Sequence, residues 1–288
     1  MVNSLLHTTY HFVRHLAHDI NNGVGPTHLV TDGWRFVRKT IPSHHPISYP
    51  PHPLYLYEQL LRSLQNDEKV VFMSLSEHVT GAARDPHKIT LLLRHDLDAG
   101  IPEVAHALCG VERSLGMRSS VHILVDGALY DPAPLADLAN ELHADGFDVG
   151  LHTQCWIHED YTSIFYAELE RFRDLFGFEP RTFTQHGAWP RTERDMQRRH
   201  EFAIRTPEII KGTSIVGYNN FFDWVSEDSC INAQPAPIHL SFFDLAERCY
   251  LGGTALILTH DNHWQASGKA AEPATANTAG CEVQLKHS

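Results

Sequence analysis

The chain of 288 residues has no uninterrupted apolar run long enough to cross a bilayer, so nothing in it predicts a transmembrane helix. Residues 1–15 are broken by histidine and arginine and lack the continuous apolar core of a signal peptide. Basic residues are also scarce, because 23 Lys and Arg stand against 35 Asp and Glu, a formal net charge of -12. Since binding to a phosphate backbone depends on clustered Lys and Arg, we expect no nucleic acid and no membrane partner, and a cytoplasmic protein.

Paired cysteines are missing too. The five cysteines are scattered and no Cys-x-x-Cys occurs: Cys109, Cys155, Cys230, Cys249 and Cys281. This pattern suggests neither a disulfide framework nor a thiolate zinc site. The hydrophobic content of 42% and charged content of 20% are those of an ordinary globular protein, long enough for one large α/β domain with an extension. What the chain has in unusual number is histidine, with 22 residues.

From residue 89 onward, strand-like and helix-like segments alternate. We expect strands at 89–93, 120–124, 148–151, 182–184 and 254–258, and helices at 101–115, 132–144, 161–175, 191–202 and 242–250. Upstream, we expect strands at 34–37 and 69–73 and a helix at 55–64, and further along a short segment at 214–218. The alternation predicts a parallel sheet that is closed or wound by crossovers.

The chain divides into three parts by its patterns. Residues 1–88 carry no motif and are expected to form an N-terminal extension that packs on or near the main domain at 89–264. Residues 265–288 are rich in Ala, Gly, Thr, Glu and Lys, which predicts a disordered tail.

Two carboxylates, Asp96 and Asp98, follow the apolar run Leu91–Leu93 and are succeeded by Gly100. Because side chains alternate along a strand, both acids are expected to point the same way from a strand end. Burying unpaired charge is costly, so such groups usually hold a metal ion or move a proton. The alternative is a solvated turn, since acids and glycine are ordinary turn residues.

Histidines stand at the ends of three further predicted strands, at His152, His186 and His260. In parallel α/β barrels the carboxyl ends of the strands carry the active site. Two histidines and an aspartate suit a catalytic divalent metal ion and leave a coordination position for water. The second carboxylate can then take a proton from that water.

Four segments resemble motifs of one family, the polysaccharide deacetylases with a NodB-homology domain, over roughly residues 89–264. Arg94-His95-Asp96-Leu97-Asp98 resembles the first motif in its Arg-His-Asp-x-Asp form, and Gly146-Phe147-Asp148-Val149-Gly150-Leu151-His152-Thr153 is similar to the second. Phe183-Thr184-Gln185-His186-Gly187 resembles a histidine-glycine strand end of the same branch, and Leu258-Thr259-His260 resembles the last motif.

The resemblance implies an irregular (β/α) barrel of the polysaccharide deacetylase type with an N-terminal extension. It also implies roles for four residues: Asp96 as the catalytic base, Asp98 and His152 as metal ligands, and His260 as the general acid. We expect one divalent metal ion, with zinc as the first choice.

The sequence departs from the family pattern in two places. The second motif usually has two histidines four residues apart, but Trp156 stands at that position and the next histidine is His158. Either His158 or His186 therefore completes the metal site. The arginine-proline motif has no clear counterpart, because Arg181 precedes the strand that ends at His186.

Other residues are weighed as substrate contacts. Arg94 and His263 are candidates for substrate binding, as are Trp189 and Trp264, for which packing in the core is the alternative. Cys155 lies near His152 in the sequence and resembles a nucleophile beside a base, but the two acids have no role in a thiol mechanism.

These features predict a metal-dependent amide hydrolase that removes an N-acetyl or similar acyl group from an amino sugar or a small sugar conjugate. Two alternatives stay open. One is a metal-dependent C–N hydrolase that acts on a non-sugar amide, and the other is a carbohydrate-binding relative without turnover. A shared scaffold does not fix the substrate.

Overall fold

The computed structural model describes residues 51–186, 192–218, 224–228 and 249–267. Its centre is an eight-stranded sheet in the order β6-β5-β4-β3-β2-β8-β7, with β1 paired to β2 beside this path, and the strands pair in parallel throughout. The strands are β1 (Val70–Met73), β2 (Ile89–Leu97), β3 (Ser120–Leu124), β4 (Asp148–Thr153), β5 (Thr182–Gln185), β6 (Gly217–Tyr218), β7 (Trp224–Glu227) and β8 (Thr254–His260).

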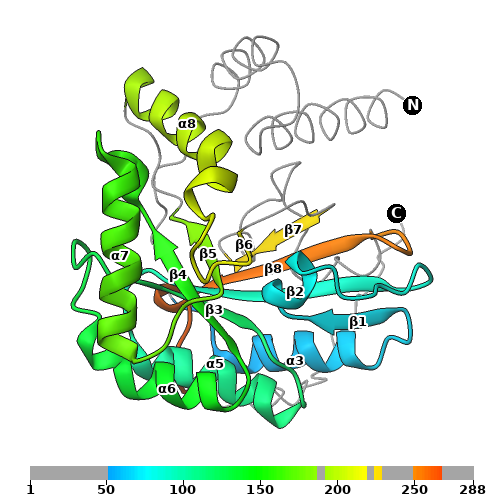
Figure 1. The fold of residues 1–288 in the computed structure, drawn as a ribbon. Helices are drawn as coiled ribbons and strands as arrows, with labels where there is room; N and C mark the ends of the chain where they lie inside the picture. The colour runs from blue at the N-terminus through cyan, green and yellow to red at the C-terminus, as the bar shows by residue number, and fades with distance from the viewer. Residues whose placement is uncertain (1–50, 187–191, 219–223, 229–248, 268–288) are drawn as a thin grey trace, which may run out of the picture.

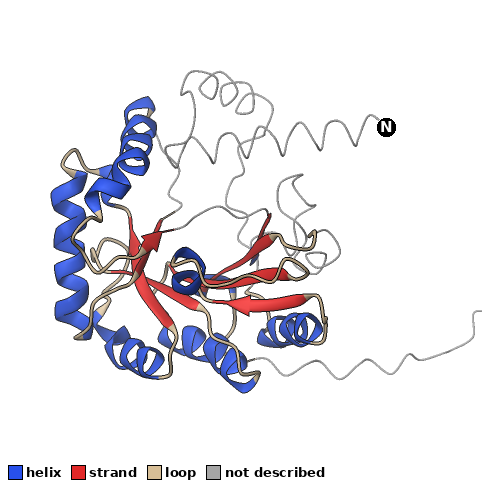
Figure 2. Cartoon of the chain, turned by 45° about the vertical axis from the view of Figure 1, so that its right-hand side comes forward, coloured by secondary structure: helices blue, strands red, loops and turns tan. Residues whose placement is uncertain are grey.

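Helices follow the outer side of the curved sheet (Figures 1 and 2). They are α3 (Leu54–Gln65), α5 (Pro102–Ser114), α6 (Ala136–Ala144), α7 (Tyr161–Phe176) and α8 (Glu193–Ile209), whereas the short α4 (Leu75–Val79) lies on the opposite face, where Leu75 packs against Leu92 and Leu256. Parallel strands joined by helices in this way confirm the predicted α/β class, an irregular (β/α) barrel. Within the described ranges, no helix has both the length and the apolar character needed to span a membrane.

Strand β2 is the centre of the sheet, and all nine of its residues are buried. Strand β8 pairs along one edge of β2. On the other edge β1 pairs with the first half, 89–92, and β3 pairs with the second half, 94–97. The described part of the predicted N-terminal extension therefore supplies a strand to the main sheet, while the boundary at residue 88 stays a prediction.

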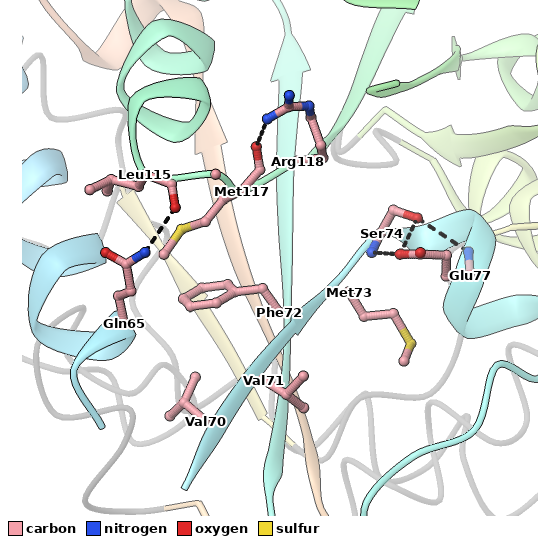
Figure 3. A pocket seen from close by; sticks show the side chains of 11 residues that line it. Gln65, Val70, Val71, Phe72, Met73, Ser74, Glu77, Leu115, Met117 and Arg118 are labelled. Atoms are coloured by element: carbon pink, nitrogen blue, oxygen red, sulfur yellow. Dashed lines mark hydrogen bonds between the residues drawn. The ribbon is translucent and has the colours of Figure 1, made fainter. Parts of the chain in front are cut away.

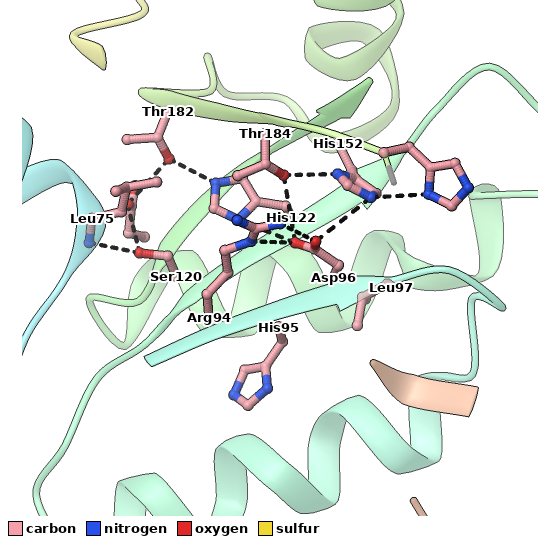
Figure 4. A network of polar contacts seen from close by, with 12 residues as sticks. Leu75, Arg94, His95, Asp96, Leu97, Ser120, His122, His152, Thr182 and Thr184 are labelled. Carbon is pink, nitrogen blue, oxygen red and sulfur yellow. Dashed lines mark hydrogen bonds and ion pairs between the residues drawn. The ribbon is translucent and has the colours of Figure 1, made fainter. Parts of the chain in front are cut away.

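The two sides of β2 have opposite chemistry because neighbouring side chains alternate. Leu91 and Leu93 lie in a hydrophobic cluster with residues of α3 and α5, among them Leu60 and Leu108. Arg94 and Asp96 lie on the opposite side of the strand from His95 (Figure 4). The helix-facing side therefore carries two leucines and then His95, whereas the inner side carries Leu92 and then becomes polar toward the carboxyl end of the strand.

Several element ends agree with the sequence. Strand β3 has the predicted bounds. Helix α7 begins after Asp160, whose side chain accepts a hydrogen bond from the Ser163 N–H, and ends at Gly177 with a φ of 78° that favours glycine. The predicted helix at 132–144 opens with a 3₁₀ turn before α6 begins at Ala136.

Other element bounds differ from the prediction. Strand β2 continues four residues beyond the predicted end, and helix α8 reaches Ile209 rather than residue 202, because Thr206 and Ile209 extend its buried face. The segment predicted at 214–218 contributes only the two residues of β6. The predicted strand at 34–37 and nearly all of the predicted helix at 242–250 lie outside the described residues.

Candidate active site

The candidate residues lie together at the carboxyl ends of four strands, β2, β4, β5 and β8. Asp96 is the register partner of His260 on β8, and His152 on β4 is the partner of Thr184 on β5. Asp98 and His186 directly follow β2 and β5. The sheet therefore assembles at its carboxyl end residues that are up to 164 positions apart in the sequence, as parallel strands do.

Asp98, His152 and His186 form a group of three potential metal ligands whose donor atoms all lie within 4.8 Å of one another. Asp98 Oδ1 lies 3.3 Å from His152 Nε2 and 3.2 Å from His186 Nδ1, and the two ring nitrogens are 3.2 Å apart. The other nitrogen of His152, Nδ1, is 2.7 Å from the hydroxyl of Thr184, which leaves Nε2 directed at the group (Figure 4).

Two imidazoles and a carboxylate in this arrangement fit a divalent metal ion with an open position. Burial alone raises the pKa of Asp98, but hydrogen bonds from the two histidines outweigh it and hold that pKa well below its usual range. Oδ1 of Asp98 is also buried and without a hydrogen-bond partner beyond these ion-pair contacts. The group thus combines an ionised carboxylate with two imidazoles whose ligand atoms converge, and the residues fit the metal that the sequence suggests.

Asp96 lies beside this group and is 2% exposed. The Arg94 guanidinium binds both of its oxygens, with Nε 2.8 Å from Oδ1 and a second nitrogen on Oδ2. Oδ2 lies 3.7 Å from His152 Nε2, so this oxygen faces the ligand group. Burial raises the pKa of Asp96, but Arg94 and His152 outweigh it and keep the carboxyl ionised.

The structure places Arg94, a candidate for substrate binding, in the interior rather than at an open surface. Its side chain is 5% exposed and is bound to Asp96. The sequence offered no clear counterpart of the arginine-proline motif, and the arginine that binds Asp96 comes from the same strand, two residues earlier. A planar guanidinium suits this task because it binds both carboxylate oxygens at once.

Asp228, directly after β7, holds three aromatic rings at the other side of the site. Its Oδ1 lies 2.9 Å from Nδ1 of both His260 and His263, and its Oδ2 accepts bonds from the His260 backbone N–H and from Trp264 Nε1 at 2.7 and 2.8 Å. Burial lowers the pKa of His260, but Asp228 outweighs it and raises that pKa to about 10. The His260 ring is therefore held protonated beside the carboxylates.

Trp264 is 2% exposed, and its ring packs edge-on against Tyr57 at 5.5 Å between centroids. It closes the barrel rather than lining an open site, whereas His263 is partly exposed beside Asp228. Trp189 lies outside the described residues. His158 is exposed and is not part of the ligand group, and Cys155 is fully buried with its thiol pKa raised by that burial.

Sequence reasoning missed several residues of the site. Asp228 follows a strand of only four residues, so no clear strand-end signal marked it. Asp261, next to His260, accepts hydrogen bonds from the backbone N–H groups of Asp98, Ala99 and Ile101 at 2.9, 2.9 and 2.7 Å. It thereby fixes the turn that carries Asp98, and its adjacency to a strand-end histidine was the available signal.

A surface pocket lies away from these residues (Figure 3). It is lined by β1 and by the turn that precedes β3, together with Gln65 and Glu77, and contains none of the candidate site residues. The residues that line it include no cluster of acids and histidines of the kind described above.

No protein-family model and no curated protein matches the chain. Solved structures do show similarity to the chain. The chain is similar to the catalytic domain of a peptidoglycan N-acetylglucosamine deacetylase from Eubacterium rectale, at 12% identity over 60% of this chain and 76% of that one, with a TM-score of 0.42. It is similar to peptidoglycan deacetylase PdaC from Bacillus subtilis, at 13% identity over 64% and 80%, with a TM-score of 0.39. It is also similar to IcaB from Ammonifex degensii, at 16% identity over 57% and 73%, with a TM-score of 0.38.

Proposed function

We propose that the protein is a metal-dependent amide hydrolase that removes an N-acetyl or similar acyl group from an amino sugar or a small sugar conjugate. The observation that carries this proposal is the group of Asp98, His152 and His186 beside the ionised carboxylate of Asp96 and the protonated ring of His260. Hydrolysis of an amide needs these three parts: a Lewis acid, a base for the water and an acid for the leaving amine.

Asp98, His152 and His186 would hold the divalent metal ion, with zinc as the first choice, and His186 takes the place that His158 is too exposed to fill. A metal ion bound there supplies polarisation of the carbonyl and a lowered pKa for water. Thr184 fixes the orientation of the His152 ring through Nδ1.

Asp96 serves as the base in this proposal. Arg94 holds its plane, and Oδ2 is the oxygen that faces the ligand group, so Oδ2 accepts the proton of the attacking water. His260 then protonates the leaving amine, and Asp228 both orients its ring through Nδ1 and keeps it charged until that step. Acid and base thus come from neighbouring strands at register partners.

The test combines metal analysis with acetate release from N-acetylated amino sugars. We expect one metal ion per chain in the wild type and in His158→Ala, and loss of metal in His152→Ala and His186→Ala. Full occupancy in His152→Ala contradicts the site. Hydrolysis of simple acylated amines without hydrolysis of amino sugars would instead favour a non-sugar amide, and sugar binding without acetate release would favour a non-catalytic relative.

A further inference from the structure

His122 is a buried histidine that the proposed mechanism does not use. It lies on β3 as the register partner of Asp96 on β2, and its side chain is fully buried. Figure 4 shows its ring between Thr182 and Asp96. A fully buried ionisable ring directly beside the base needs an explanation in terms of its contacts.

The hydrogen bonds around Thr182 fix which ring nitrogen of His122 carries the hydrogen. Asp148 Oδ2 accepts bonds from the Ser76 N–H, the Ser120 hydroxyl and the Thr182 hydroxyl at 3.0, 2.9 and 3.1 Å. Because the single hydroxyl hydrogen of Thr182 goes to Asp148, Thr182 Oγ1 can only accept from His122 Nε2, which lies 3.1 Å away. Nε2 therefore carries a hydrogen.

The other ring nitrogen, Nδ1, carries a lone pair. Burial holds the pKa of His122 well below its usual range, so the ring is neutral and has one hydrogen only, on Nε2. Nδ1 has no hydrogen-bond partner and lies 3.9 Å from Asp96 Oδ1. The inner oxygen of the base thus faces an acceptor, whereas its other neighbours, Arg94 and Thr184, donate to it.

The ring has little room to move. A Cβ added at Gly150 would lie 2.7 Å from Cδ2 of His122 and 2.6 Å from the backbone oxygen of Thr182, so only glycine fits beside it. The backbone of β4 therefore holds the ring between the base and Thr182, and the direction of Nδ1 is built into the sheet.

We propose that His122 is a positioning residue for Asp96, through a tautomer that Thr182 and Asp148 impose. This inference rests on the proposed function for its catalytic consequence. With no hydrogen on Nδ1, the ring does not draw Oδ1 toward β3, so Arg94 sets the plane of the carboxylate and Oδ2 stays directed at the ligand group. A ring with a hydrogen on Nδ1 would donate to Oδ1 and compete with Arg94.

The first test is Thr182→Val, which removes the acceptor for Nε2 and leaves Asp96 as the available partner of the ring. Thr90→Val is the matched control, because Thr90 is also a buried threonine of the sheet but lies outside the site. We expect ¹⁵N NMR to show a neutral Nε2–H ring for His122 in the wild type and in Thr90→Val, and an Nδ1–H ring in Thr182→Val. We expect crystal structures to show the Asp96 carboxylate shifted toward His122 in Thr182→Val alone.

Turnover is the second readout. We expect kcat of Thr182→Val to fall by about 10- to 100-fold, with KM and metal content unchanged, because a base displaced by a fraction of an ångström loses its alignment. His122→Asn is the second variant, since its amide N–H reaches the Nδ1 position, and we expect the same shift and the same fall. Thr182→Ser keeps the hydroxyl, so we expect this variant to have the Asp96 position and the kcat of the wild type.

The outcomes separate this inference from the proposed function. A protonated or Nδ1–H His122 in the wild type overturns the inference, and so does a Thr182→Val protein with a changed tautomer but an unmoved Asp96 or an unchanged kcat. A wild type that hydrolyses no amide contradicts the proposed function instead, while NMR and the crystal structures still decide whether the tautomer controls the position of Asp96.

Discussion

Asp96 and Asp98 stand two residues apart, yet different side chains surround their carboxylates. Asp98 shares its oxygen with two imidazoles, whereas Asp96 is bound by a guanidinium. We expect Asp98→Asn to lose metal affinity and turnover together. Asp96→Asn should keep its metal while turnover falls by about 10²–10⁴, the usual contribution of general acid–base catalysis. Metal content and steady-state kinetics of both variants test this, and metal loss in Asp96→Asn with retention in Asp98→Asn would reverse the roles.

Asp228 contributes most to the charge of His260, which makes the pH profile informative. Burial lowers the pKa of His260, and Asp228, followed by Asp98 and Asp96, raises it to about 10, so removal of Asp228 takes away the largest raising effect. We expect the basic limb of the kcat/KM profile to move to lower pH in Asp228→Asn. His263→Ala is the control, because it removes the other ring on the same oxygen and keeps the carboxylate. An unchanged basic limb in Asp228→Asn would show that His260 is not the acid.

The same residue pair makes a prediction about stability. A histidine whose pKa is raised on folding stabilises the protein fully below its unfolded pKa of about 6.5, and this contribution is lost as pH rises through about 10. The free energy of unfolding of the wild type exceeds that of Asp228→Asn by this contribution at low pH. We therefore expect the difference between the two proteins to decrease as the pH rises from about 6.5 to about 10. Urea unfolding at several pH values measures it, and a difference that widens toward pH 10 would contradict the assignment.

At the scale of the element, a buried polar network holds β2 on the side that faces helices α3 and α5. Glu112 on α5 is fully buried, and its Oε1 accepts the hydroxyl of Tyr57 and lies 2.8 Å from His95 Nε2, while the other nitrogen of His95 contacts the Thr259 hydroxyl. The network joins α3, α5, β2 and β8. The strand that carries Asp96 is therefore fixed by hydrogen bonds on the side that faces away from the site.

Removal of one partner from this network should destabilise the fold. We expect Tyr57→Phe to lower the free energy of unfolding by about 1.5–3 kcal/mol, the contribution of a hydrogen bond to a charged group. Glu112→Ala should lower it further, because it removes the acceptor for two buried groups, and each buried polar group left unpaired costs about 1–3 kcal/mol. Tyr55→Phe on the same helix is the matched control. Urea unfolding of the three variants provides the measurement, and equal stabilities for Tyr57→Phe and Tyr55→Phe would contradict a structural role for the network.

For the molecule as a whole, alternation of strands and helices was enough to predict the parallel sheet and to place the candidate residues at the carboxyl ends of its strands. The end of β2 could not be predicted in the same way. Arg94, His95 and Asp96 have the polarity of a strand end, but the strand continues through them. Pairing with β3 and β8, the ion pair of Arg94 with Asp96 and the contact of His95 with Glu112 compensate their burial. That compensation depends on contacts far apart in the sequence.

The site shows the same division between local and distant signals. Asp98, His152 and His186 could be found because each stands next to a strand pattern of its own, but only the structure shows that His186, and not His158, lies in a group with the other two. The partners of Asp228, which are His260, His263 and Trp264, stand 32 to 36 residues further along the chain, and pairing of β7 with β8 brings them together. The neighbours of Asp228 in the sequence therefore gave no signal for it.

The last prediction concerns where the folded unit ends. Trp264 is buried against Tyr57 and donates to Asp228, and the Gln265 N–H donates to the His52 carbonyl at 2.9 Å. Residues 268–288 lie outside the described ranges, and Val283 and Leu285 are their only large aliphatic residues, so the sequence offers little apolar surface to bury. Packing contacts of the described chain thus reach Gln265.

We expect a truncation after Ser267 to keep the melting temperature, the metal content and the turnover of the full chain. A truncation after His263 should melt at a lower temperature, because it removes the Trp264 ring from the core together with its bond to Asp228, which also orients His260. Thermal unfolding with metal analysis compares the two proteins. A loss of cooperative melting in the Ser267 truncation would show that 268–288 docks onto the body, and equal melting of both truncations would show that Trp264 does not hold the barrel closed.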